Sequence, residues 1–100
     1  MAAGRLSSTG QVAHFLCEMF TRLEVVGLTD GSSFRLPISQ SELGDAMGLS
    51  VVHVNRTLQQ MRRDRLIEWQ ADTVRILDRE RLRDTAEFDP TYLNLVPIPR

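Results

Sequence analysis

The side chains with the clearest potential for chemistry lie close together near the middle of the chain. Asn55, Arg56 and Gln59 share one side of a segment with helical spacing, and Val52 lies one turn before Arg56. A guanidinium can bond guanine at two acceptors, a carboxamide can pair with adenine, and valine methyls fit the methyl group of thymine. We therefore expect these four side chains to contact base edges in a DNA groove, with Arg56 as the strongest contact.

Further arginines surround this group. Arg62 and Arg63 lie farther along the segment, where we expect them to contact phosphates, and the hydroxyl of Ser50 precedes it. Residues 50–83 hold eight arginines and five acidic residues and carry +3, whereas the whole chain carries −1. All twelve basic residues are arginine, which favours forked contacts with phosphate or guanine, although a compositional bias of the genome explains the missing lysine equally well.

Other kinds of site have little support in the sequence. Cys17 and His14 share part of a helix surface, but two ligands make a poor metal site, so we expect a partly buried thiol and no metal. The carboxylates lack the spacing of a general acid and base pair. We expect neither enzyme activity nor a cofactor in this chain, and we expect Trp69 to belong to the core.

Length and composition predict one packed domain. The 100 residues are 42% hydrophobic and 25% charged, close to globular averages. The apolar runs are too short to span a bilayer, and the first residues lack the pattern of a signal peptide. A single cysteine gives no internal disulfide, so we expect a cytoplasmic protein without a membrane partner.

The elements that position these side chains follow from periodicity and caps. Ser8 and Gln11 form a capping-box pattern that predicts a first helix ending near Val26, with Gly27 in a left-handed conformation. Residues 29–33 are typical of a turn. Residues 34–38 alternate and predict a short strand at a sheet edge, because a proline at 37 cannot donate to a ladder.

A helix-turn-helix follows. Ser39 and Glu42 form a second capping box, and a short helix after them has an inward face of Leu43, Ala46 and Met47. The next residues are a glycine suited to a tight turn, a leucine for the core, and Ser50 as the cap of a third helix at 51–65. The inward face of that helix is formed by Val54, Leu58 and Met61.

Two short strands complete the pattern. Residues 66–69 and 73–77 predict a hairpin, or wing, around a turn at 70–72. Asp78 predicts the start of a last helix with Leu82 as its anchor. The expected fold is a winged helix-turn-helix, mainly α with a small antiparallel β wing. Its expected boundaries are a tail at 1–7, the domain at 8–86 and a tail at 87–100.

These elements match a known family. Residues 36–77, above all ISQSELGDAMGLS at 38–50 and VNRTL at 54–58, resemble the C-terminal DNA-binding domain of the Crp/Fnr superfamily of bacterial transcription regulators. The resemblance implies a homodimer that binds a two-fold operator, with the third helix in the major groove and RNA polymerase as a further partner. Arg56 falls on the base-reading arginine of the family. The positions that touch the sugar-phosphate backbone in the family are occupied by Ser39, Gln40, Ser50, His53, Gln70 and Ala71.

The chain departs from the family in two ways. Val51 and Val52 stand where the family commonly has Arg-Glu or Val-Glu, so the acidic base reader is absent and we expect Asn55 to compensate in part. The effector-binding β-roll and dimerisation helix of the family do not fit before Ser8, so we expect either a fragment or a naturally short form. The alternative function is a winged-helix module that binds an acidic protein surface without DNA specificity.

Overall fold

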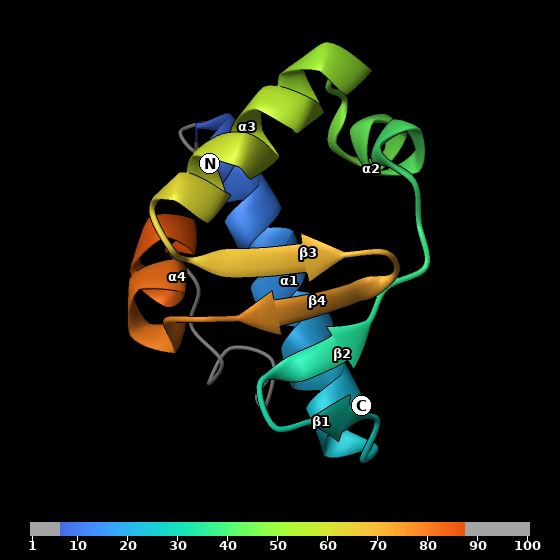
Figure 1. Cartoon of the computed structure of the whole chain (residues 1–100), viewed down its shortest axis with the longest axis vertical. Coiled ribbons are helices and arrows are strands. Elements are labelled where there is room, and N and C mark those ends of the chain that lie inside the picture. The colour runs from blue at the N-terminus through green and yellow to red at the C-terminus, as the bar shows by residue number, and fades with distance from the viewer. Residues whose placement is uncertain (1–6, 88–100) are drawn as a thin grey trace, which may run out of the picture.

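The computed structural model describes residues 7–87 and has the predicted fold class (Figure 1). The expected tails at 1–7 and 87–100 lie outside the described residues, apart from Ser7 and Glu87. Within residues 7–87, four helices accompany one small sheet. In chain order the elements are α1 (Ser8–Val25), β1 (Thr29–Asp30), β2 (Ser33–Arg35), α2 (Gln40–Met47), α3 (Val51–Arg63), β3 (Ile67–Gln70), β4 (Thr73–Ile76) and α4 (Arg79–Ala86).

The start of α1 differs by one residue from the prediction. The cap is Ser7, whose hydroxyl accepts a hydrogen bond from the Gly10 amide at 3.1 Å, and Ser8 is the first helical residue. Two adjacent serines compete for the cap, and the choice of Ser7 leaves the Ser8 hydroxyl available to α3. The end of α1 is as predicted, because Gly27 has φ +76°.

The sheet is larger than the predicted wing. Its strands are antiparallel in the order β1-β2-β4-β3, so residues 29–30 form a strand rather than part of a turn. The strand predicted at 34–38 forms as β2, but its predicted place at a sheet edge was wrong, because β2 lies between β1 and β4. Pro37 does not prevent this arrangement, since β2 ends at Arg35 before the proline is reached.

The helix-turn-helix follows its predicted caps. Ser39 and Glu42 form both hydrogen bonds of the capping box, at 3.0 and 2.8 Å. Gly48 turns the chain with φ +75°, and Ser50 caps α3 through the His53 amide at 3.1 Å. Helix α3 ends two residues earlier than predicted, and Ala46, predicted to face inward, is exposed.

The wing is a tighter hairpin than predicted. Gln70 pairs with Thr73, so the turn contains only Ala71, with φ +53°, and Asp72. The Asp72 carboxylate accepts a hydrogen bond from Arg35 at 2.6 Å, which joins the wing to β2. The wing is therefore fixed to the sheet along β4 and at its tip.

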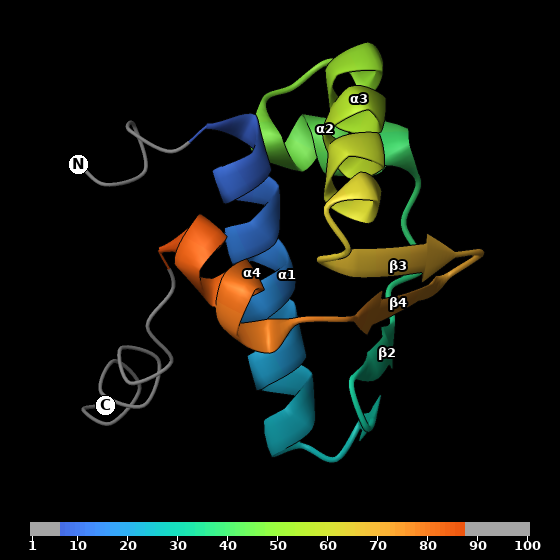
Figure 2. The same cartoon turned by 60° about the vertical axis from the view of Figure 1, so that its left-hand side comes forward.

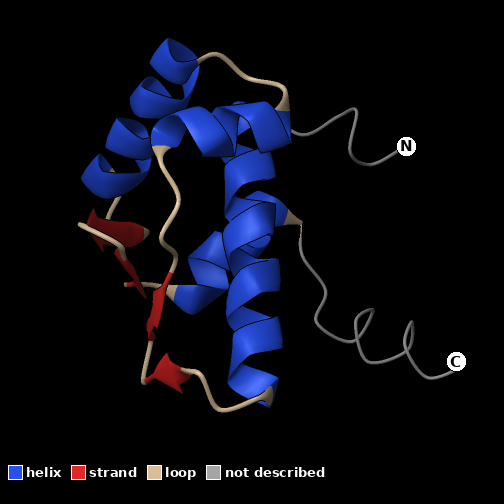
Figure 3. Cartoon of the chain, turned by 90° about the vertical axis from the view of Figure 1, so that its right-hand side faces the viewer, coloured by secondary structure: helices blue, strands red, loops and turns tan. Residues whose placement is uncertain are grey.

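The core lies where α1 meets the other elements. Figures 2 and 3 show α4 along one side of α1, the sheet along another, and α2 and α3 at its N-terminal end. Leu82 anchors α4 as predicted and is fully buried, and Trp69 packs partly buried against the core. The Phe20 and Phe34 rings meet edge to face at 5.8 Å, joining α1 to the sheet. Helix α3 is thus supported from behind along its apolar side.

Candidate nucleic-acid interface

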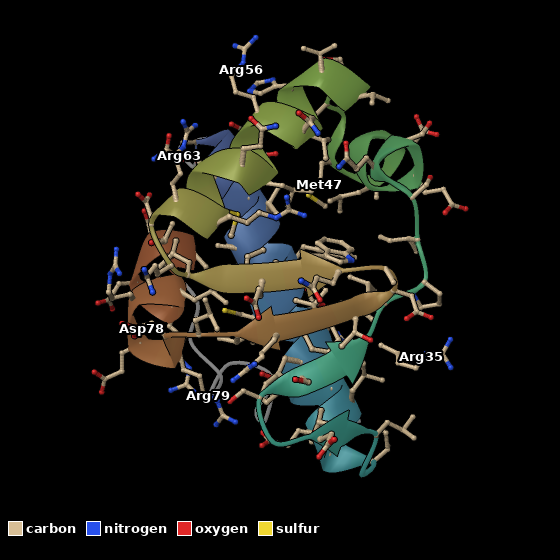
Figure 4. The ribbon with its side chains drawn as sticks, in the orientation of Figure 1. Arg35, Met47, Arg56, Arg63, Asp78 and Arg79 are labelled. Carbon is tan, nitrogen blue, oxygen red and sulfur yellow. The ribbon has the colours of Figure 1, made fainter. Side chains whose placement is uncertain are left out.

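One side of α3 is exposed and carries all four predicted base-contacting residues. Burying the opposite side, which includes Val54, Leu58 and Met61, sets the rotation of the helix. The residues left facing solvent are Val52, Asn55, Arg56 and Gln59. Figure 4 shows the Arg56 side chain extending away from the domain. Arg56 is exposed, and within residues 7–87 the structure gives its guanidinium no hydrogen bond or ion pair.

Asn55 is held by the preceding helix. The side-chain amide Nδ2 of Asn55 donates a hydrogen bond to the side-chain oxygen Oε1 of Gln40 at 3.2 Å, across the helix-turn-helix. An amide nitrogen carries two protons, so the second N–H and the Asn55 carbonyl oxygen stay available to another partner. The half-buried Gln40 therefore restrains a predicted base contact, besides its own predicted place at the phosphates.

His53 belongs to a small hydrogen-bonded cluster that the sequence did not reveal. Its Nε2 lies 3.0 Å from the Ser8 hydroxyl at the start of α1, and the buried Thr57 hydroxyl donates to the same oxygen at 3.2 Å. This cluster fastens the first turn of α1 to α3. The only sequence signal for it was the place of Thr57, a polar residue on the apolar side of a predicted helix.

The predicted phosphate-contacting residues lie on three separate elements. Ser39 and Ser50 are exposed at the first turns of α2 and α3, where backbone amides point outward. Arg63 is exposed at the end of α3 and points away from the domain (Figure 4). At the wing, Gln70 and Ala71 are exposed next to the turn.

Arg62 has a structural partner as well. Its guanidinium donates to the Trp69 carbonyl oxygen at 2.9 Å and so joins the end of α3 to β3. The groove between these elements is mainly basic and polar. It is lined by Arg62, Arg63, Arg65, Ile67, Glu68, Trp69, Gln70 and Leu77. The basic surface thus continues from α3 to the wing.

The remaining candidates for chemistry are less accessible. Burial raises the pKa of Cys17 to about 11, against an opposing effect of the Arg83 charge, so the thiol stays protonated at neutral pH. The Nδ1 atom of His14 lies 4.0 Å from the Oε1 atom of Glu18. Among residues 7–87, no three histidine, cysteine or acidic side chains gather as metal ligands. None of the described helices is long and apolar enough to cross a membrane.

Comparison with known proteins decides the family. The family described as the Crp-like helix-turn-helix domain matches residues 10–85. This chain belongs to that family. It is therefore a DNA-binding domain of the kind that bacterial transcription regulators use, and the exposed side of α3 lies on the second helix of its helix-turn-helix.

Two curated relatives are transcriptional activators. Over 68 residues, or 68% of this chain, it is 35% identical to the transcriptional activator protein FnrA of Stutzerimonas stutzeri. Over 79 residues, or 78% of the chain, it is 37% identical to the transcriptional activatory protein AadR of Rhodopseudomonas palustris. The matched parts are only 28% and 32% of those two proteins, so the chain spans about three tenths of their length.

Solved structures give the same fold. FixK2 from Bradyrhizobium japonicum superposes with a TM-score of 0.69 at 30% identity, over 82% of this chain and 39% of that one. A transcriptional regulator of the CRP family from Thermus thermophilus gives a TM-score of 0.67 over 86% of this chain and 43% of that one. At 22% identity the second match shows the fold alone.

Proposed function

We propose that the domain binds a specific DNA sequence by inserting α3 into the major groove. The observation that carries the proposal is the exposed side of α3, where Arg56 extends from a helix whose other side is packed into the core. Arg56 bonds a guanine at two acceptors, Asn55 and Gln59 pair with adenine, and Val52 lies against a thymine methyl. Regulation of transcription is the output of this binding.

Phosphate contacts fix the orientation of α3 in the groove. The helix starts at Ser39 and Ser50 approach one stretch of backbone, together with Gln40 and His53. Arg62 and Arg63 at the far end of α3 approach another, and the wing adds Gln70 and Ala71. These contacts carry little sequence information and give the affinity its salt dependence.

The domain works as part of a two-fold assembly. Two copies placed on a two-fold operator insert their α3 helices into successive major grooves, about one helical turn apart. The longer relatives support this proposal, because a protein about three times this length has room for a dimerising part. RNA polymerase is the proposed partner for the regulatory output, and the cytoplasm is the proposed location. The domain itself acts without catalysis or a cofactor.

Selection of preferred sites from random duplexes tests the proposal with a matched pair of arginines on α3. Arg56→Ala should relax preference at one base position and weaken the best site by about 1–3 kcal/mol. Arg63→Ala should weaken all sequences alike. Equal base preferences for Arg56→Ala and the parent would remove Arg56 from the readout.

Salt dependence separates DNA binding from binding to an acidic protein. For DNA, log affinity should fall with log salt concentration by about 0.9 for each phosphate neutralised, and a preferred sequence should emerge. A module for acidic protein surfaces gives modest salt dependence and no preferred sequence. That second result would overturn the proposed function.

A further inference from the structure

The start of α3 presents an exposed apolar surface. Val51 and Val52 are 47% and 67% exposed, although the rest of the exposed side of this helix is polar or charged. Both valines lie outside the buried core, and exposed apolar side chains at the first turn are unfavourable in water. They lie at the end of α3 that enters the groove under the proposed function.

The same turn lacks an acceptor for cytosine. Cytosine presents an N4 amino group in the major groove, and an acidic side chain is its usual partner. The first turn of α3 contains no acidic residue. Val52 can therefore contact a pyrimidine only at C5, where thymine carries a methyl group. The valine forms no hydrogen bond with the amino group of cytosine or the keto group of thymine.

Arg56 completes the site. It lies four residues after Val52, so the two side chains are neighbours on one helix face and approach adjacent base pairs. The guanidinium takes a guanine while the valine methyls cover the C5 position of the neighbouring pyrimidine. The pair together is suited to a step of a C5-methylated pyrimidine followed by guanine.

We infer that Val52 recognises the C5-methyl group itself, so that 5-methylcytosine replaces thymine at this position and DNA methylation strengthens binding. The inference rests on the proposed function and adds the chemical group that the site selects. Burying one methyl group of the base against the valine is worth about a fourfold change in affinity.

The test uses the full chain and the duplex obtained by site selection. At each pyrimidine of the half-site, four duplexes carry thymine, uracil, cytosine or 5-methylcytosine, and affinity is measured by fluorescence anisotropy. At one position, the duplex with thymine should bind about fourfold tighter than the duplex with uracil. The duplex with 5-methylcytosine should likewise bind about fourfold tighter than the duplex with cytosine. Thymine and uracil differ only by the methyl group, so this ratio isolates it.

Variants assign the effect to the valine. Val52→Ala should shrink both ratios toward one, and Val52→Glu should favour cytosine, whose N4 amino group donates a hydrogen bond to the new carboxylate. Val25→Ala is the matched control, because Val25 is 78% exposed at the other end of the domain and should leave both ratios unchanged. A circular dichroism melt of each variant checks that it is folded.

Two failures are distinguishable. If a preferred site emerges but duplexes with thymine and uracil bind equally at every position, the methyl inference and the proposed contact of Val52 are wrong, and sequence-specific binding through α3 stands. The same conclusion follows if Val52→Ala keeps both ratios. If site selection yields no preferred sequence, the proposed function itself fails.

Discussion

Gly44 sets the distance between α2 and the start of α3. It is buried in α2, and its carbonyl oxygen accepts hydrogen bonds from the Gly48 amide and, at 2.8 Å, from the Leu49 amide. A Cβ atom added to Gly44 would lie 2.5 Å from the Leu49 carbonyl oxygen and 3.3 Å from a Val54 methyl. Ordinary contact begins at 3.4 Å, so the turn must move by about 0.9 Å to admit alanine.

Gly44→Ala should therefore destabilise the domain. Alanine is favoured over glycine inside a helix by about 1 kcal/mol, but overpacking against backbone costs about 3 kcal/mol at the upper end of its range. The net loss is about 1–2 kcal/mol, or roughly 5–15 °C in melting temperature for a domain of this size. The displaced turn also moves the cap of α3, and losing one charge-assisted phosphate contact weakens DNA binding by about tenfold.

Gly48→Ala is the matched control. Gly48 has φ +75° and no neighbour within 4 Å of an added Cβ atom, so alanine there meets only the backbone penalty of about 1–2 kcal/mol. Both variants should melt earlier, measured by circular dichroism. At a temperature where both are folded, only Gly44→Ala should lose DNA affinity. A Gly44→Ala protein that melts at or above the parent would refute the close-contact argument.

Two further perturbations address the caps and the wing. Ser39→Ala should destabilise α2 by about 0.5–2 kcal/mol, because alanine lacks the hydroxyl that accepts the hydrogen bond from the Glu42 amide. An unchanged melting temperature with weaker DNA binding would instead make the serine primarily a DNA contact. The Arg35 hydrogen bond lowers the pKa of Asp72, so its contribution to stability is present above the unfolded-state pKa and is lost as pH falls through the folded-state pKa. The free energy of unfolding of Asp72→Asn, measured as the pH is lowered, should lack that contribution. Identical curves of unfolding free energy against pH for the variant and the parent would contradict the prediction.

Features set by neighbouring residues were predictable from sequence. The caps at Ser39, Ser50 and Asp78 all form, because each needs only a side chain and an amide a few residues ahead. The left-handed conformation of Gly48 was predictable for the same reason, because it depends only on the short turn between the two helices. The exception at Ser7 and Ser8 has the same origin, since two adjacent serines give the same local signal and the contacts of Ser8 with α3 are not visible in sequence.

Features set by distant residues were not predictable. The strand at 29–30 contains turn-forming residues and exists because β2 offers it a partner, while β2 in turn is paired with β4 about forty residues later. The Ser8 cluster joins residues 45 and 49 apart in sequence. Pairing between such segments depends on the packed core, which local periodicity does not describe.

The candidate site lies between these two cases. The exposed side of α3 follows from periodicity alone, because burying Val54, Leu58 and Met61 leaves Arg56 facing solvent. The hydrogen bonds that restrain side chains on this side of α3 cannot be predicted from periodicity. Gln40 of α2 holds Asn55, and Ser8 of α1 holds His53. A helix that reads bases must be fixed to within a fraction of an ångström. Sequence periodicity therefore shows which side chains of α3 face solvent, and the long-range hydrogen bonds show how two of them are held in place.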